Sequence, residues 1–483
     1  MIPKQAYLII DIGTGNVRVA VAENSGNILS VESDHMHYEK DYAYPESIYF
    51  DPDALWEQLV SLAKVALSKA GDVKILAITA TSQREGIVAI DKSGNAMIGM
   101  PNIDHRGREW ENIAEDKQEI YQRTGRYPTS LFSALKLVGL EKRQPELWQN
   151  FETFLSISDW AQFKLSGIKG YEHSQASETL LYDVAEGKWS ERLCTIYGLN
   201  PNILPPLHAS GTILGDILPD IARDLSISGK AQIVVGGSDT QLAILSIHPS
   251  VDDVVVVSGT TTPIIKITDR YITDEQERTW TSRHTDPSSF LLEANAGVTG
   301  LNYQRLKDIF YPNEGYEIIE KEVENISNAQ TVAALGSLLA DEKTPLIRGG
   351  FVFNTPVSHQ LTRGDFVFAT LWDITCSIFE NYKSLCQVSG HSLDYIWVCG
   401  GGVQSRVLRQ FIANLTGKKV MIRDNYRQAS VVGGVFVCNQ ALGIATEIPP
   451  TLEVVSPQPT EQEGLWYDDW KKTRLAFKST LCP

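Results

Sequence analysis

The sequence predicts an α/β protein of two domains with a cleft between them, and three observations lead to this prediction. The chain has 483 residues, more than one ordinary hydrophobic core accommodates. Short apolar runs, typical of buried strands, alternate with longer segments of helical periodicity. A pattern of strand, Gly/Thr turn and strand occurs near the start of each half, within 7–21 and 253–268, which indicates a duplicated fold.

Composition and charge exclude several classes of protein. The chain is 43% hydrophobic and 21% charged, as in globular proteins, and no apolar run approaches the ~20 residues of a membrane span. Its net charge of −16 argues against nucleic-acid binding. Asp11 precedes any possible signal-peptide core, and the six cysteines form no C-x-x-C pair. We therefore expect reduced thiols and a cytoplasmic location. His35 and His37 are expected to be surface histidines rather than metal ligands.

The first predicted hairpin, YLIIDIGTGNVRVAV, has a turn whose residues could bind an anion. Glycines let backbone N–H groups approach an anion closely, and short polar side chains and an arginine add further donors. Asp11, at the end of a buried strand, can hold Mg²⁺ or its water. The alternative is a hairpin whose glycines serve only the turn. Neither a dinucleotide-binding fingerprint nor a P-loop is present. The candidate phosphate ligands are Thr14, Gly15, Asn16 and Arg18.

The second hairpin, DVVVVSGTTTPIIKIT, repeats this composition at Gly259 and Thr260. Two such hairpins in two halves predict that one polyphosphate is gripped from both sides. Pro249 to Asp253, just before the second hairpin, is the expected hinge.

A polar segment follows the strand predicted at Lys74 to Thr81. Gln, Arg and Glu at a strand end are poor core residues and good binders of hydroxyl groups. The segment from Asn102 to Arg106 has a similar composition, with Asn, Asp and Arg at alternating positions. The alternative is an exposed turn with an ordinary ion pair. Because the protein is acidic, an anionic ligand needs local cations, for which Arg18, Arg84 and Arg106 are candidates. The candidate ligands for a polyol are Gln83, Arg84, Glu85, Asn102, Asp104 and Arg106.

Two strand-to-helix turns carry further candidates. In GGSDTQ, Asp239 is either a helix N-cap or a general base, and Thr240 follows it. In CGGGVQS, a glycine run between a strand and a helix suits a flat nucleobase lying on backbone, at Gly400, Gly401 and Ser405.

Local patterns predict several further elements. Asp53 is expected to cap a helix that Gly71 ends, and Leu155 to Leu165 is expected to be helical. The segment beyond Leu442 is expected to be a polar, peripheral tail.

In this order, the motifs DIGTGNVR, GGSDTQLA, SGTTTP and CGGGVQS resemble those of the FGGY carbohydrate kinases, in the actin-like ATPase superfamily, over roughly 1–445. The resemblance implies two RNase H-like domains with mixed β-sheets flanked by helices. The implied boundaries are 1–249 for the sugar side, 250–445 for the nucleotide side and 446–483 for a tail packed on the second domain.

The resemblance also implies a role for individual residues. Asp239 matches the base that takes the proton of the substrate hydroxyl, and Asp11 the residue near Mg²⁺. Arg84 and Glu85 match the polyol-binding pair of glycerol kinase, and Asp104 and Arg106 match the W-x-D-x-R segment of its relatives. Nucleotide contacts are implied for Thr14, Gly15, Asn16, Arg18, Thr260, Gly300, Gln304, Gly401 and Ser405.

Two departures from the family pattern bear on the substrate. Asn102 stands where the family has Trp, so a more polar substrate is implied, and residues 348–364 replace the usual G-E-R-x-P loop. The segments SQREGIV and NIDHR look most like the autoinducer-2 kinases, which act on a linear dihydroxydione-type sugar; pentulose kinases are next nearest.

The resulting prediction is a carbohydrate kinase that uses ATP and Mg²⁺ to phosphorylate a primary hydroxyl of a small sugar, ketose or polyol. The alternatives are a catalytically silent sugar sensor and a filament-forming actin relative, both disfavoured by the intact Asp11, Asp239 and substrate motifs. No nucleic-acid or membrane partner is expected, and a homodimer is left open.

Overall fold

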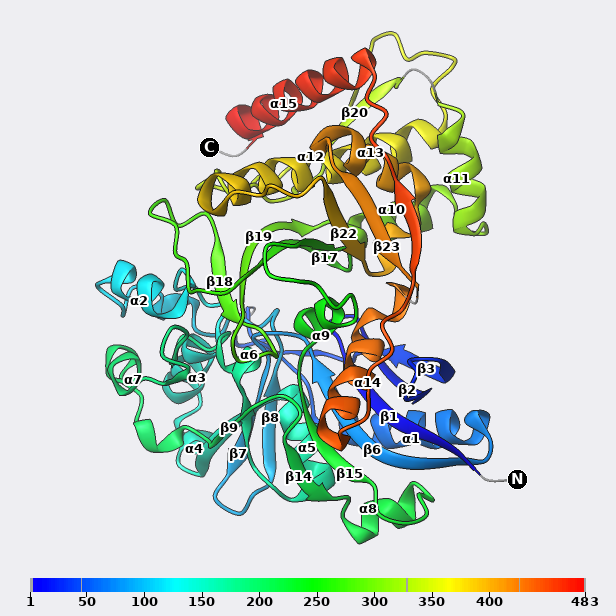
Figure 1. Ribbon diagram of the computed structural model, residues 1–483. Coiled ribbons are helices and arrows are strands. Elements are labelled where there is room, and N and C mark those ends of the chain that lie inside the picture. The colour runs from blue at the N-terminus through cyan, green and yellow to red at the C-terminus, as the bar shows by residue number, and fades with distance from the viewer. Residues whose placement is uncertain (1–2, 45, 327–328, 425, 482–483) are drawn as a thin grey trace.

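The computed structural model describes residues 3–44, 46–326, 329–424 and 426–481. Two large β-sheets, one in each half of the chain, lie one above the other in Figure 1, with helices on their faces. None of the helices in these ranges is both long and apolar enough to cross a membrane.

The first sheet has the strand order β14-β15-β6-β1-β2-β3. The pairs β1–β2, β2–β3 and β14–β15 are antiparallel, and β1–β6 and β6–β15 are parallel, so the sheet is mixed. Its strands are β1 (Lys4–Ile12), β2 (Asn16–Glu23), β3 (Ile28–His35), β6 (Val73–Ser82), β14 (Ile213–Asp216) and β15 (Gln232–Ser238). A separate three-stranded sheet contains β7 (Ile87–Asp91), β8 (Ala96–Met100) and β9 (Phe151–Ser156).

The second sheet repeats this arrangement in the order β18-β19-β17-β16-β22-β23-β24. Here β16, β17 and β19 form the antiparallel meander, β22 and β23 continue in parallel, and β24 closes an antiparallel edge. The duplicated fold predicted from the two hairpins is therefore confirmed. The strands are β16 (Val254–Val257), β17 (Thr261–Thr268), β18 (Trp280–Arg283), β19 (Phe290–Val298), β22 (Tyr395–Cys399), β23 (Lys419–Arg423) and β24 (Thr451–Val455).

Helices cover both sheets, and most begin or end where local sequence signals place them. Gly71, Gly167 and Gly417 end their helices as turn-forming residues should. In the first half the helices are α1 (Pro52–Ala70), α2 (Lys117–Thr124), α3 (Ser133–Arg143), α4 (Pro145–Trp148), α5 (Ile157–Ser166), α6 (His173–Ala176), α7 (Glu191–Tyr197), α8 (Pro219–Asp224) and α9 (Asp239–Leu245). In the second half they are α10 (Gly300–Phe310), α11 (Tyr316–Glu324), α12 (Arg363–Ser389), α13 (Arg406–Thr416), α14 (Ala429–Leu442) and α15 (Glu461–Leu481).

Helix α14, late in the chain, packs on the first sheet (Figure 1). A Cβ added to Gly433 would lie 1.9 Å from a backbone oxygen of α9, and one added to Gly434 would lie 2.8 Å from Ile9. Only glycine permits such a close approach. Tyr7 also donates to Asn439 Oδ1 at 2.7 Å. The C-terminal half is thereby anchored against β1.

The hairpin of β18 and β19 contacts the N-terminal half from the other side. The Thr281 N–H donates to the Gly125 carbonyl at 3.1 Å, and Arg283 Nε donates to the Val184 carbonyl at 2.7 Å. Two separate elements of the C-terminal half, this hairpin and α14, therefore contact the first half.

Some local predictions were wrong. Asp51, not Asp53, caps α1, accepting from the N–H groups of residues 53 and 54, because the helix already begins at Pro52. Leu155 lies in strand β9, and its helix starts only at Ile157. The tail is not merely peripheral, since β24 joins the second sheet and Trp470 of α15 is 1% exposed.

The remaining expectations concern loops, boundaries and thiols. The unusual 348–364 segment contains β21 (Gly350–Phe353), which pairs with β20 (Thr331–Ala334). The boundaries after 249 and 445 and the hinge at 249–253 stay predictions. The cysteines within the described residues are free, and Cys482 lies outside them.

Candidate active site

Asp239 is the first residue of α9, directly after β15. Ser238 occupies the N-cap position, so the interpretation of Asp239 as N-cap is wrong. Its Oδ1 accepts from the Thr240 N–H at 2.7 Å and from the Thr240 hydroxyl at 3.3 Å. Burial, followed by the nearby charge of Asp11, raises the pKa of Asp239 to about 6, while Arg84 acts in the opposite direction. A carboxylate with this pKa is a competent general base near neutral pH.

Asp11 is the buried penultimate residue of β1, close to the first turn. Its Oδ2 accepts from Arg18 Nη1 at 3.2 Å and from the Ser430 hydroxyl at 2.8 Å. Ser430 lies in the first turn of α14, 419 residues away in sequence. One carboxylate oxygen is thus held by both halves of the protein.

The first turn is braced at its base and open at its tip. The Gly13 N–H donates to the Asn16 carbonyl at 2.9 Å. Tyr38 donates to the Thr14 carbonyl at 2.7 Å, and Asn102 Nδ2 donates to Thr14 Oγ1 at 2.8 Å. Gly15 and Asn16 are exposed. The turn therefore offers polar groups to a ligand without rearranging its base.

Gln83 and Asn102 connect this turn to the end of β6. The Asn102 N–H donates to Gln83 Oε1 at 2.9 Å, and Gln83 Nε2 donates to the Tyr38 hydroxyl at 3.2 Å. Within the described residues, the buried Asn102 Oδ1 has no hydrogen-bond partner. A bound ligand with a donor group would satisfy it.

The second turn lies against two glycine-rich segments. A Cβ added to Gly300, at the start of α10, would lie 2.1 Å from the Gly259 carbonyl oxygen, and one added to Gly400 would lie 2.3 Å from the Ser258 carbonyl oxygen. The Gly402 N–H donates to the same Ser258 oxygen at 2.9 Å. These glycines bring the second hairpin, α10 and the loop after β22 together.

The residues predicted to contact the nucleotide differ in their exposure to solvent. Ser405 is buried, and its hydroxyl accepts from the Leu408 N–H at 3.2 Å as the N-cap of α13. The exposed members of the set are Gly15, Asn16, Gly259, Thr260, Gln304 and Gly401.

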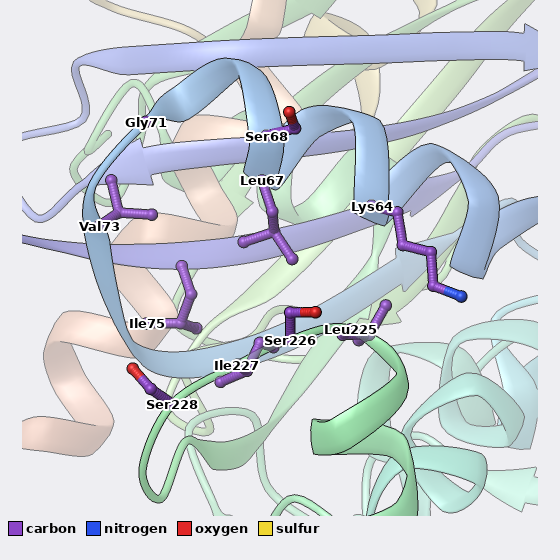
Figure 2. A pocket seen from close by; sticks show the side chains of 10 residues that line it. All are labelled: Lys64, Leu67, Ser68, Gly71, Val73, Ile75, Leu225, Ser226, Ile227 and Ser228. Atoms are coloured by element: carbon purple, nitrogen blue, oxygen red, sulfur yellow. The ribbon is translucent and has the colours of Figure 1, made fainter.

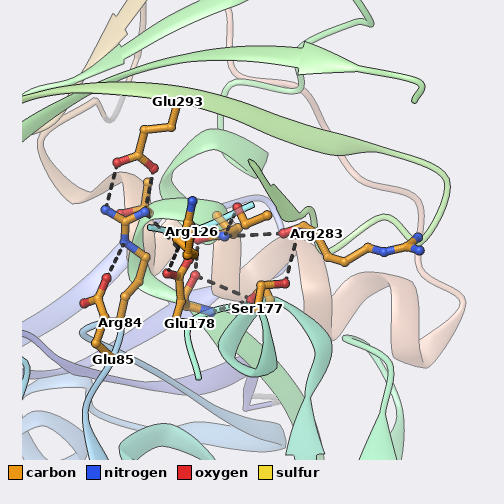
Figure 3. A network of polar contacts seen from close by, with 12 residues as sticks. Arg84, Glu85, Arg126, Ser177, Glu178, Arg283 and Glu293 are labelled. Atoms are coloured by element: carbon orange, nitrogen blue, oxygen red, sulfur yellow. Dashed lines mark hydrogen bonds and ion pairs between the residues drawn. The ribbon is translucent and has the colours of Figure 1, made fainter. Parts of the chain in front are cut away.

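Arg84 joins the two halves of the chain (Figure 3). Its Nη1 and Nη2 donate to Glu293 Oε2 and Oε1 at 2.6 and 3.1 Å, and its Nε lies 4.0 Å from Glu85 Oε1. Glu293 belongs to β19. Arg84 is 8% exposed, so the interpretation of this segment as an exposed turn is wrong. The predicted cleft is bridged here by an ion pair between the halves.

A second buried ion pair lies beside the first (Figure 3). Arg126 Nε and Nη2 donate to Glu178 Oε2 and Oε1 at 2.9 and 2.6 Å. The Arg126 guanidinium also lies 4.9 Å from the ring centre of Trp280 on β18. Glu178 Oε1 is 3.8 Å from Arg84 Nη1, so the two pairs form one network.

Glu85 adopts a backbone conformation that its residue type rarely takes. Its φ is +61° and it is buried, and such strain is concentrated at functional sites. Burial raises the pKa of the Glu85 carboxyl. Burial also lowers the pKa of Lys136, on α3, which interacts electrostatically with Glu85 and Asp104.

Asp104 and Arg106 bind each other. Arg106 Nε donates to Asp104 Oδ2 at 2.7 Å, and the Ile48 N–H donates to Asp104 Oδ1 at 2.9 Å. Both residues are buried. Their polar groups are therefore already engaged with each other and with the Ile48 backbone.

Comparison with known proteins identifies the family. Residues 6–246 match the model of the FGGY family of carbohydrate kinases, N-terminal domain, and residues 327–442 match the C-terminal domain. The chain belongs to the FGGY family of carbohydrate kinases.

Curated relatives extend along nearly the whole chain. A protein of Bacillus subtilis (strain 168) named "Putative sugar kinase YoaC" is 49% identical over 479 residues, covering 99% of this chain and 98% of YoaC. An autoinducer-2 kinase of Salmonella paratyphi A is 26% identical, covering 92% and 87% of the two chains. A xylulose kinase of Staphylococcus epidermidis is 24% identical, covering 91% and 88%.

Solved structures share the fold of this FGGY kinase. The xylulose kinase of Lactobacillus acidophilus has a TM-score of 0.82 at 17% identity, covering 98% of this chain and 97% of that one. The gluconate kinase of the same organism has a TM-score of 0.81 at 18% identity, with the same coverage. The glycerol kinase of Plasmodium falciparum with ADP has a TM-score of 0.83 at 20% identity, covering 100% and 99%. At these identities the likeness shows the fold alone.

Several residues of this kinase site could not be found from sequence motifs. Ser430 and Glu293 reach the site from distant segments, and Lys136 and Glu178 lie outside every motif. The three cations expected to await an anionic ligand are each paired with a carboxylate: Arg18 with Asp11, Arg84 with Glu293 and Arg106 with Asp104.

A surface pocket of about 280 Å³ lies elsewhere in the kinase (Figure 2). It lies between the end of α1, the start of β6 and residues 225–228, and it includes Lys64 and Ser226. None of the predicted site residues lines it, so it has no part in the proposed reaction.

Proposed function

We propose that this FGGY kinase transfers the γ-phosphoryl group of ATP to a primary hydroxyl of a small sugar, ketose or polyol. The observation that carries the proposal is Asp239, whose raised pKa and position at the start of α9, near both Asp11 and Arg84, suit a general base. The family supports the use of ATP and a sugar as substrates.

The transfer needs one proton acceptor and accurate positioning. As the substrate oxygen forms its bond to the γ-phosphorus, its proton passes to the Asp239 carboxylate. The bond from the γ-phosphorus to the bridging oxygen breaks, and ADP leaves with that electron pair. Little covalent chemistry is required of the protein, because positioning and electrostatic stabilisation supply most of the acceleration.

The two hairpins are the proposed phosphate-binding groups. The exposed Gly15 and Asn16 in the first half and Gly259 and Thr260 in the second offer backbone N–H groups and short polar side chains to a polyphosphate. The loop around Gly401, held against the second hairpin, is the proposed adenosine support.

Asp11 is the proposed residue beside Mg²⁺. Its carboxylate oxygens are ligands of the kind Mg²⁺ prefers, and it lies near enough to Asp239 for its charge to raise the pKa of that residue. When bound, the ion would neutralise charge on the phosphates.

The substrate is proposed to be a linear dihydroxydione-type sugar or a pentulose. An autoinducer-2 kinase and a xylulose kinase are among the relatives. Asn102 supplies a polar group where the family's Trp would supply an apolar wall, and its unpartnered Oδ1 suits a substrate hydroxyl.

The test is ADP release with Mg-ATP over a panel of acceptors. The panel holds D- and L-pentuloses, glycerol, four-carbon polyols, sugar acids and the linear dihydroxypentanedione. Preference for the dione or a pentulose is expected. Asp239→Asn should retain ADP binding by calorimetry and lose about 10²–10⁴-fold in turnover; full turnover would remove Asp239 from the role of base. Silence across the panel with sugar binding retained would favour a catalytically silent sensor.

A further inference from the structure

The side chain of Glu293, in the C-terminal half of the chain, accepts hydrogen bonds from Arg84, the arginine of the predicted sugar-binding pair. It receives both outer nitrogens of Arg84, at 2.6 and 3.1 Å, and Asn295 Nδ2 donates to its Oε1 at 2.8 Å. Glu293 is 2% exposed and Arg84 8%. Because both charged groups are shielded from water, this bidentate contact is stronger and better ordered than an ion pair on the surface.

Charge around Arg84 is balanced pair by pair. Two further buried arginines of this network form ion pairs, Arg126 with Glu178 and Arg106 with Asp104. Lys136 interacts electrostatically with Asp104 and, to a smaller extent, with Glu85. Arg18 pairs with Asp11, and Asp239 adds another carboxylate nearby. Among the described residues of this network, each arginine therefore already has a carboxylate partner.

This balance separates neutral from anionic substrates. A sugar acid would bring a carboxylate into a buried site where Arg84 is already neutralised, and an unpaired buried charge is strongly disfavoured. A neutral hydroxyl meets no such penalty. Glu293 Oε2 accepts one hydrogen bond among the described residues, from Arg84, and a carboxylate oxygen accepts two. Glu293 Oε2 can therefore accept a hydrogen bond from a substrate hydroxyl while it keeps its bond from Arg84.

We infer that Glu293 is a specificity-determining residue, which restricts this kinase to uncharged sugars by occupying Arg84. The inference rests on the proposed function, because it takes Arg84 and Glu85 as the sugar-binding pair. Glu293 is contributed by β19, in the half of the chain opposite to the predicted sugar motifs.

The test compares kcat/KM for the best neutral acceptor of the panel with that for the acid of the same carbon chain. The wild type should prefer the neutral acceptor strongly. Glu293→Gln removes the charge and keeps the shape, so Arg84 becomes available to a carboxylate. The ratio of neutral to acid kcat/KM should fall by about tenfold or more in this variant.

The matched control is Glu342→Gln. Glu342 also receives two nitrogens of an arginine, Arg474 of α15, at 3.1 and 2.7 Å, but it lies outside the network around Arg84. This variant should leave the ratio unchanged. If Glu293→Gln lowers both kcat/KM values by the same factor, the ion pair is only structural and the inference is overturned.

A second measurement uses the wild type alone, so it does not depend on the folding of a variant. The acid should not compete with the neutral acceptor at concentrations near the KM of that acceptor; competition with a similar constant would overturn the inference. A wild type that phosphorylates no acceptor would instead refute the proposed function itself, and the two failures are thereby distinguished.

Discussion

The raised pKa of Asp239 predicts a specific pH dependence. The side chain must be ionised to accept a proton, so activity should be lost as the pH falls through the pKa. Burial and the Asp11 charge place that pKa at about 6 rather than at the ordinary aspartate value of 3.8. We expect kcat/KM for the sugar to fall with a slope of one below a midpoint near pH 6.

The size of the effect follows from the two pKa values. With a pKa of about 6, roughly nine-tenths of Asp239 is ionised at pH 7 and about one-tenth at pH 5, so kcat/KM should drop about tenfold between them. With an ordinary aspartate pKa, more than roughly nine-tenths would still be ionised at pH 5. The expected difference is far outside the error of a rate measurement.

The assay is direct chromatographic measurement of ADP at saturating Mg-ATP, which avoids coupling enzymes with their own pH dependence. Circular dichroism at pH 5 checks that the protein remains folded. The assigning variant is Thr240→Val, which removes the 3.3 Å hydrogen bond to Asp239 Oδ1. Because this bond favours the charged form, its loss should raise the midpoint. A midpoint near pH 4, or one that Thr240→Val does not move, would refute the assignment to Asp239.

Three further predictions concern stability and metal use. Gly433→Ala should lower the free energy of unfolding in urea by about 1–3 kcal/mol, because its Cβ would lie 1.9 Å from a backbone oxygen of α9. Gly464→Ala, in open space on α15, should raise it by about 0.5–1 kcal/mol; equal effects would contradict the packing. Arg126→Met should cost about 3–5 kcal/mol by leaving Glu178 unpaired, and adding Glu178→Leu should restore most of this; no recovery in the double variant would argue against the pair. Asp11→Asn should raise the Mg²⁺ concentration needed for half-maximal ADP release, and an unchanged requirement would exclude Asp11 from the metal site.

Local sequence patterns predicted most elements and both hairpins. The strands beside the Gly/Thr turns are apolar runs with clear boundaries, and a turn with glycine and short polar residues leaves few alternatives. The repeat of this pattern then predicted the duplicated topology. Two errors arose from short-range competition: Asp51 and Asp53 are both plausible caps, and the helical stretch from Leu155 begins in the strand that precedes it.

The contacts between the halves could not be predicted in the same way. Ser430 and Asp11 are 419 residues apart, and Arg84 and Glu293 are 209 apart. A serine in an apolar helix and a glutamate in a strand carry no local signal of such partners. The same limitation led to the expectation that Arg18, Arg84 and Arg106 would be free for an anion, because the sequence shows which charges exist but not which of them are already paired.

Strand β19 connects Glu293, which binds Arg84, to the second Gly/Thr hairpin. Glu293 lies on it at Arg84, and Val298, five residues later, pairs with Thr261 beside the second phosphate hairpin. Five residues of strand span about 17 Å, and a strand held in a sheet moves as a rigid unit. The Thr299 N–H, next in the chain, donates to the Thr260 carbonyl at 3.2 Å. A register shift between Thr261 and Pro263 interrupts this pairing, but one strand still connects the second hairpin to Glu293. We therefore expect that a displacement of this hairpin on ligand binding would also displace Glu293 and change its contact with Arg84.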